Sequence, residues 1–178
     1  LISKGNLRIE IEKKIIEVFQ ILAEAEGKVH GIDPEDVHFH EIGSIDSLID
    51  VIGVCTAFHF LKPKIIYSNP PTLGNGFAQT EHGKITIPSP AVIELVTKNN
   101  IKICQKFDSE EGELSTPTGV ALLICLVDSF EIPYTYSINS YGVGIGDRKI
   151  SCPNLTRVLN INSFHKKSFM GKISPQYE

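Results

Sequence analysis

The feature that most constrains the fold is a helical repeat of apolar residues near the N-terminus. Between Arg8 and Ala25, apolar side chains recur at steps of three and four residues, and charged side chains occupy the positions between them. This pattern predicts an amphipathic helix over residues 8–25, with Gly27 as its C-terminal stop. The helix needs apolar partners, and a hydrophobic fraction of 42% is enough to build a core around it.

Helical and strand-like segments alternate along the rest of the chain, and turns rich in proline or glycine separate them. We therefore predict an α/β (or α+β) fold with short strands interleaved with helices in a mixed sheet. One domain is expected over residues 1–161, followed by a polar tail or linker over 162–178. Further helices are predicted over 45–61, 90–98 and 120–127, strands over 37–41, 65–68, 101–106, 134–138 and 155–161, and a hairpin of 78–80 with 84–87.

The composition argues against several classes of protein. The formal net charge is −4, and lysine and arginine residues form no run longer than a pair such as Lys166-Lys167, so we predict no binding of nucleic acid. No apolar run approaches the length of a membrane span, and we predict no membrane association. The four cysteines form no C-x-x-C pair; Cys55 and Cys125 lie in apolar helical runs, where they are expected to be small buried residues of a cytoplasmic protein.

Residues 37–50 carry the strongest signal for a metal ion. In a strand over 37–41, His38 and His40 point to one face and Glu41 to the other. In a following helix, Asp46 and Asp50 are four residues apart and share a face. Imidazole and carboxylate together suit nickel, zinc or iron better than magnesium. The alternative is that Asp46 only stabilises the first turn of a helix beside a polar strand.

Two further segments are candidates for ligand contacts. His82, at the predicted hairpin turn, is a candidate ligand or general acid, or else an exposed turn residue. In residues 113–119, a helix start places backbone N–H groups next to Thr116, Thr118 and Gly119. This arrangement suits a phosphate or carboxylate, although the same residues also suit ordinary helix capping.

The fourth segment is a glycine-rich stretch over 141–148, which we expect to form a loop. Gly142 and Gly144 would allow the backbone to approach a ligand closely, and Arg148 would grip a phosphate or remain solvated. The spacing does not match the dinucleotide-binding fingerprint. No Ser/His/Asp elbow or Walker loop is present, so covalent nucleophilic chemistry has no support.

Taken together, these segments resemble the nickel insertion proteins of nickel-pincer cofactor biosynthesis, the LarC family. Each motif is weak alone, but four of them follow one another in the family's order over about residues 30–161. The matching stretches are Val37–Glu41 with Gly43 and Asp46–Asp50, then His82–Lys84 with Ile87–Ala91, then Glu113–Leu114 with Thr116–Gly119, and finally Tyr141–Gly144 with Pro153–Asn154 and Arg157–Val158.

The resemblance implies a cytoplasmic enzyme that binds Ni²⁺ and inserts it into a pyridinium bisthiocarboxylate mononucleotide with the use of CTP. The finished cofactor would serve lactate racemase and related enzymes, so a nickel-dependent racemase-type apoenzyme is an expected partner, as is a second copy in a homo-oligomer. His38, His40, Glu41, Asp46 and Asp50 would lie near the metal. His82, Thr116, Thr118, Gly119, Gly142, Gly144 and Arg148 would lie near the mononucleotide.

The chain also departs from the family's pattern. The glycine- and aspartate-rich segment that normally precedes the first helix, a histidine-rich stretch and the C-terminal CTP domain do not occur in it. We therefore expect a central fragment of a nickel insertase, of the lyase or chelatase class, that is inactive alone. Two alternatives stay open: a non-catalytic scaffold or oligomerisation module, and a metal-dependent hydrolase that uses a metal-activated water.

Overall fold

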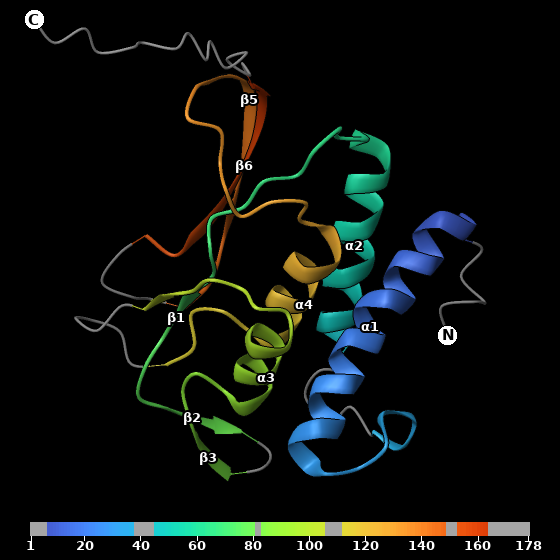
Figure 1. The fold of residues 1–178 in the computed structure, drawn as a ribbon, viewed down its shortest axis with the longest axis vertical. Coiled ribbons are helices and arrows are strands. Elements are labelled where there is room, and N and C mark those ends of the chain that lie inside the picture. The colour runs from blue at the N-terminus through green and yellow to red at the C-terminus, as the bar shows by residue number, and fades with distance from the viewer. Residues whose placement is uncertain (1–6, 38–44, 81–82, 106–111, 149–152, 164–178) are drawn as a thin grey trace, which may run out of the picture. The chain divides into compact units, whose positions relative to one another are not determined.

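The computed structural model describes residues 7–37, 45–80, 83–105, 112–148 and 153–163. Within these residues helices and short strands alternate, which confirms the predicted α/β class (Figure 1). The chain divides into two compact units, residues 1–131 and residues 132–178. The first unit contains the helices, and the described residues of the second contain a pair of long strands.

Helix α1 (Ile9–His30) is the predicted amphipathic helix, and it runs one turn further than expected. Gly27 lies inside this helix rather than at its end, and Gly31 provides the left-handed C-cap, with φ 70° and a backbone N–H that donates to the Gly27 carbonyl. A Cβ atom at position 27 would lie 2.9 Å from the Ile32 carbonyl oxygen. Glycine at position 27 thus serves close packing of the chain that follows the helix.

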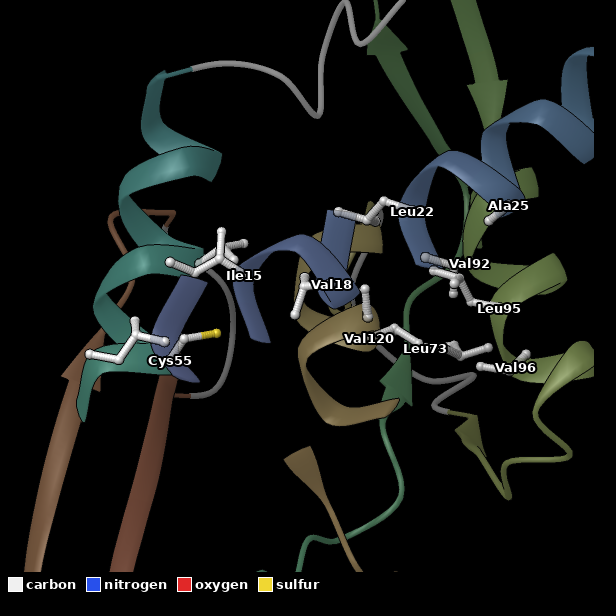
Figure 2. Packing of buried hydrophobic residues seen from close by; sticks show 13 residues of the cluster. Ile15, Val18, Leu22, Ala25, Cys55, Leu73, Val92, Leu95, Val96 and Val120 are labelled. Carbon is white, nitrogen blue, oxygen red and sulfur yellow. The ribbon is translucent and has the colours of Figure 1, made fainter. Parts of the chain in front are cut away.

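Three further helices pack on α1 and enclose the core of the first unit (Figures 1 and 2). They are α2 (Ile45–Leu61), α3 (Pro90–Lys98) and α4 (Pro117–Leu126), as the sequence predicts to within a few residues, and the short 3₁₀ helix η2 (Pro34–Asp36) follows α1. The apolar stripe of α1 is fully or almost fully buried against them. The core contains Ile11, Ile15, Val18, Leu22, Ala25, Val51, Cys55, Leu73, Val92, Leu95, Val96, Val120 and Ala121.

In the described ranges the strands form three separate two-stranded sheets, one parallel and two antiparallel. The parallel pair and one antiparallel pair belong to the helical unit, and the other antiparallel pair is the second unit. The pairs are β1 (Thr72–Leu73) with β4 (Cys104–Gln105), β2 (Phe77–Thr80) with β3 (Gly83–Thr86), and β5 (Tyr136–Ile145) with β6 (Leu155–Ser163).

Three strand predictions need correction. Residues 65–68 form no strand, although Tyr67 makes an isolated bridge to Ser129. The predicted strand over 101–106 is paired only at Cys104 and Gln105 among the described residues. The glycine-rich stretch over 141–148 is a loop only in its last residues, because strand β5 continues through Gly142 and Gly144 to Ile145.

The cysteines behave as the sequence predicts. Cys55 is buried in the core and Cys125 is half-buried at the end of α4. Burial raises the pKa of the Cys125 thiol to about 11, and the nearby Lys14 ammonium opposes this rise. Lys14 also donates to the Cys125 carbonyl at 3.3 Å, as a cation near a helix C-terminus does. Among the described helices, none is long and apolar enough to cross a membrane.

Candidate functional site

Several side-chain hydrogen bonds of the helical unit gather around strand β1. Ser115 Oγ donates to the Thr72 carbonyl at 2.7 Å, and Gln105 Nε2 donates to the Gly74 carbonyl at 3.0 Å. The side chains of β4 and of the segment before α4 therefore hold the end of β1 in place. Gly74 and Asn75 directly follow β1, so this polar region includes the chain just beyond the carboxyl end of that strand. In open α/β sheets, ligands bind beyond the carboxyl ends of parallel strands.

The segment before α4 also makes close backbone contact with the end of β1. Gly112 N–H donates to the Asn75 carbonyl at 2.6 Å, in an isolated antiparallel bridge. A Cβ atom at Gly74 would lie 1.8 Å from the Gly112 carbonyl oxygen. The two segments of backbone can therefore meet only because position 74 has no side chain. This contact fixes the backbone position of Gly112 and so of the next residue, Glu113.

Glu113 connects this segment to the start of α3. Its Oε1 accepts a hydrogen bond of 3.0 Å from Ser89 Oγ, and Ser89 is only 6% exposed. Ser89 occupies the N-cap position of α3 but makes no side-chain cap bond. A carboxylate at the N-terminal end of a helix is stabilised by the free N–H groups and dipole there. Glu113 is therefore held at a defined place between the starts of α3 and α4.

Thr116 and Gly119 form the start of α4 as the capping alternative predicts. The exposed Thr116 accepts a hydrogen bond of 3.2 Å from Gly119 N–H through its side chain. Pro117 has no N–H, and Val120 N–H donates to the Thr116 carbonyl. The half-buried Thr118 therefore offers the remaining first-turn N–H together with a hydroxyl group. This is a small donor set, sufficient for one oxygen atom of an anionic group.

The predicted metal ligands are only partly within the described residues. Asp46 and Asp50 lie four apart on the exposed side of the first turns of α2. His38, His40 and Glu41 lie outside the described residues, so the structure does not test the strand in which they were placed. In the described parts of the chain, no group of three or more His, Cys, Asp or Glu side chains is placed to hold a metal ion.

The remaining predicted ligand residues lie in the second unit or outside the described residues. Gly142 and Gly144 lie in β5, where they pair with Val158 and Thr156 of β6. Arg148 lies beyond β5, where its carbonyl accepts a hydrogen bond from Asn154 Nδ2 at 3.0 Å. These three residues belong to the second unit. His82 lies outside the described residues.

Sequence reasoning missed the residues that build the strand end. Ser89 was named only as part of the matching stretch Ile87–Ala91, and Gln105, Asn75 and Ser115 were not singled out. The partner of Ser89 lies 24 residues away and that of Gln105 lies 31 residues away, so no local pattern contains either pair. Glu113 was visible only as the first residue of the segment that leads into α4.

Comparisons with known proteins give these features a context. The chain matches the family model described as "Nickel insertion protein" over residues 1–174. A protein of Synechococcus sp. (strain JA-3-3Ab) named for nickel insertion is 37% identical over 158 residues, which is 89% of this chain and 39% of that protein. A protein of Methanococcoides burtonii, also named for nickel insertion, is 39% identical over 159 residues. The match covers 89% of this chain and 39% of that protein.

A third relative has a more specific name. The pyridinium-3,5-bisthiocarboxylic acid mononucleotide nickel insertion protein of Acetivibrio thermocellus is 34% identical over 173 residues, which is 97% of this chain and 42% of that protein. The chain thus spans about two fifths of the length of these relatives. No solved structure matches it. Because the family model covers nearly all of the sequence, the chain belongs to the nickel insertion protein family.

Proposed function

We propose that this chain is the nickel- and substrate-binding part of a protein that inserts Ni²⁺ into pyridinium-3,5-bisthiocarboxylic acid mononucleotide. The observation that carries the proposal is the family match over residues 1–174, together with the relative named for this substrate. In this proposal Ni²⁺ is a substrate that the protein delivers. CTP would be consumed by a part of the full-length protein outside this chain, and the product would serve a lactate racemase-type enzyme in the cytoplasm.

The described residues support a division of labour within the helical unit. Asp46 and Asp50 lie within ten residues of the His38–Glu41 segment in the sequence, and their carboxylates are exposed and available to an ion. The end of β1 and the start of α4 supply neutral hydroxyl and N–H donors and one fixed carboxylate, Glu113. We propose that the acidic start of α2 contributes to the nickel site. Thr116, Thr118 and Gly119 would contact the phosphate of the mononucleotide.

We propose that the substrate lies near His82, Gly142, Gly144 and Arg148. The two glycines would contact it from a strand and not from a loop. Gly142 and Gly144 offer an open strand surface, because a Cβ atom at either position would meet nothing within 4 Å. The substrate would contact the flat face of the β5–β6 strand pair there, and not a loop wrapped around a phosphate. Arg148, just beyond β5, would supply the positive charge.

Calorimetric titration of Ni²⁺ into the chain tests the metal part of the proposal. We compare the wild-type chain with a His38→Ala/His40→Ala variant and with an Asp46→Asn/Asp50→Asn variant. Because loss of groups that only support a metal ligand already costs about 10- to 100-fold in affinity, loss of the two imidazoles should cost more than about 100-fold. The matched control is His30→Ala/His59→Ala, which removes two imidazoles from α1 and α2.

The control variant should bind Ni²⁺ as the wild-type chain does. Equal affinity of the wild-type chain and the His38→Ala/His40→Ala variant would remove these residues as ligands. Absence of Ni²⁺ binding by the wild-type chain would favour the scaffold alternative.

A further inference from the structure

Lys14 and Cys125 lie against each other where α1 packs on the end of α4. The Lys14 Nζ atom is 3.8 Å from Cys125 Sγ, and it donates a hydrogen bond of 3.3 Å to the Cys125 carbonyl. The Cys125 thiol in turn donates to the Lys14 carbonyl at 3.9 Å. Each side chain therefore contacts the backbone of the other residue. These reciprocal contacts hold an amine beside a thiol that is 111 positions away in the sequence.

Both side chains are open to a small reagent. The Lys14 side chain is 45% exposed, and Cys125 is half-buried. Cys55 of α2, in contrast, is only 3% exposed and lies within the core (Figure 2). Of these two cysteines, Cys125 is therefore the one that a small oxidant such as hydrogen peroxide reaches first.

Glu17, one turn further along α1, completes the cluster. Its carboxylate accepts a hydrogen bond of 2.9 Å from Lys14 Nζ. This bond keeps the amine in place beside the sulfur, and the carboxylate can accept a proton that leaves the nitrogen. A sulfur nucleophile, a nitrogen nucleophile and a proton acceptor thus lie together between α1 and α4.

We propose that a peroxide converts this contact into a covalent cross-link, a sulfenamide in which Lys14 Nζ is bonded to Cys125 Sγ. Cysteine sulfenic acids condense with a nearby backbone nitrogen in this way. In this chain the Lys14 amine takes the place of the backbone nitrogen. The cross-link joins α1 to α4 covalently, and a thiol reductant reverses it.

The chemistry uses one peroxide for each cross-link. The Cys125 thiolate attacks an oxygen atom of hydrogen peroxide, so the O–O bond breaks, an S–O bond forms, and the departing hydroxide takes up the proton that the thiol has lost. The neutral Lys14 amine then attacks the sulfur, so an S–N bond forms and the S–O bond breaks. Glu17 accepts the proton that the nitrogen releases and passes it to the second hydroxide. The products are the sulfenamide and two water molecules, and the two electrons lost by sulfur reduce the peroxide.

The protonation of the cluster sets the pH dependence of this reaction. Burial raises the pKa of the Cys125 thiol to about 11; Glu17 and Cys55 act in the same direction, and the Lys14 ammonium opposes them. The pKa of the Lys14 amine is also raised, mainly by its hydrogen bond to Glu17. Because the thiolate and the neutral amine are the reactive forms, the rate should rise at least about tenfold per unit between about pH 8 and about pH 10.

Mass spectrometry of the full chain after treatment with hydrogen peroxide at about pH 9, where part of the thiol is ionised, tests the proposal. A Cys104→Ser/Cys152→Ser background leaves only Cys55 and Cys125 as thiols. After trypsin digestion, the peptide that contains Lys14 should be joined to the peptide that contains Cys125. The joined mass should be lower than the sum of the two peptides by two hydrogen atoms, and a thiol reductant should separate them.

Two arginine variants of neighbouring lysines provide the matched comparison. Lys14→Arg keeps the positive charge but removes the amine, so no cross-link should form, and dimedone should trap the sulfenic acid at Cys125. Lys13→Arg makes the same change one residue earlier on α1, and its cross-link should form as in the parent chain. Circular dichroism verifies that both variants are folded. If Lys14→Arg is not, Lys14→Gln carries the comparison.

Three results would overturn the proposal. One is a Cys55–Cys125 disulfide as the main product of the parent chain, since the neighbouring thiol would then have outcompeted the amine. Another is oxidation of Cys125 to the sulfinic acid without any cross-link. The third is a cross-link that forms equally well in Lys14→Arg, because its nitrogen would then come from a different residue.

Discussion

Helices α3 and α4 begin with the same local sequence signal but use it differently. Each starts with a hydroxyl residue followed by proline, Ser89-Pro90 in α3 and Thr116-Pro117 in α4. The exposed Thr116 side chain caps its own helix through Gly119 N–H. The buried Ser89 side chain makes no cap and donates to Glu113 instead. One hydroxyl therefore stabilises a helix locally, and the other joins two distant segments.

The difference shows that burial decides the role of a capping residue. An exposed hydroxyl has only water as its alternative partner, so it stabilises the fold most by accepting a hydrogen bond from a free N–H of the first helical turn. A buried hydroxyl next to a carboxylate has a stronger partner, because hydrogen bonds to charged groups are about twice as strong as neutral ones. The following three variants test this comparison, from the largest expected effect to the smallest.

Replacement of Ser89 should have the largest effect on stability. Ser89→Ala removes a hydrogen bond to a carboxylate in a largely buried place, so the free energy of unfolding should fall by about 2 kcal/mol. Urea denaturation of the chain measures this loss. A double-mutant cycle with Glu113→Gln isolates the pair from other effects of either change. Additive losses in the cycle would show that the two side chains do not act together.

Replacement of Thr116 should cost less, because only a solvent-exposed cap is lost. Thr116→Ala should lower the free energy of unfolding by about 1 kcal/mol, and Thr116→Ser should restore most of it. Thr118→Ala is the matched control, since it removes a hydroxyl two residues away that is not the cap. A loss for Thr118→Ala as large as for Thr116→Ala would contradict the assignment of the cap to Thr116.

Replacement of Gly119 should have the smallest effect on stability and should separate stability from ligand binding. A Cβ atom there would lie 3.4 Å from Thr116 Oγ1, an ordinary contact, so Gly119→Ala should raise the free energy of unfolding by about 0.5 kcal/mol. If α4 binds the mononucleotide phosphate as proposed, the same variant should bind the mononucleotide more weakly. Urea denaturation and calorimetric titration with the mononucleotide measure the two effects.

Gly53→Ala in α2 serves as the control for Gly119→Ala. A Cβ atom at position 53 would meet nothing within 4 Å, so alanine should stabilise this helix to a similar extent without any change in binding. Unchanged affinity of Gly119→Ala would remove Gly119 from the proposed phosphate contact, whatever its effect on stability.

The sequence predicts the helices well because their signals are local. The bounds of α2 are those predicted, and α3 begins and ends where the Ser-Pro signal and Lys98 place it. The glycine-rich stretch was predicted wrongly for a physical reason. Tyr141, Val143 and Ile145 alternate with glycines, so the stretch has the period of a strand, and pairing with β6 outweighs the low strand preference of glycine.

The candidate site was only partly predictable. The capping role of Thr116 follows from the residues beside it, and the structure confirms it. The position of Glu113 depends on Ser89, and the end of β1 depends on Gln105 and Ser115. These partners come from segments that are far apart in the sequence, and long-range hydrogen bonds of this kind leave no periodic trace in a sequence.

The bare backbone at Gly74 links the strand end to the carboxylate. Any β-carbon there would collide with the Gly112 carbonyl and push residues 112–114 outward, so Glu113 would leave the reach of Ser89. A single missing methyl group thereby sets the distance between the end of β1 and the start of α3. A substitution at position 74 would therefore act on Ser89, fifteen residues further along the chain, through the segment that carries Glu113.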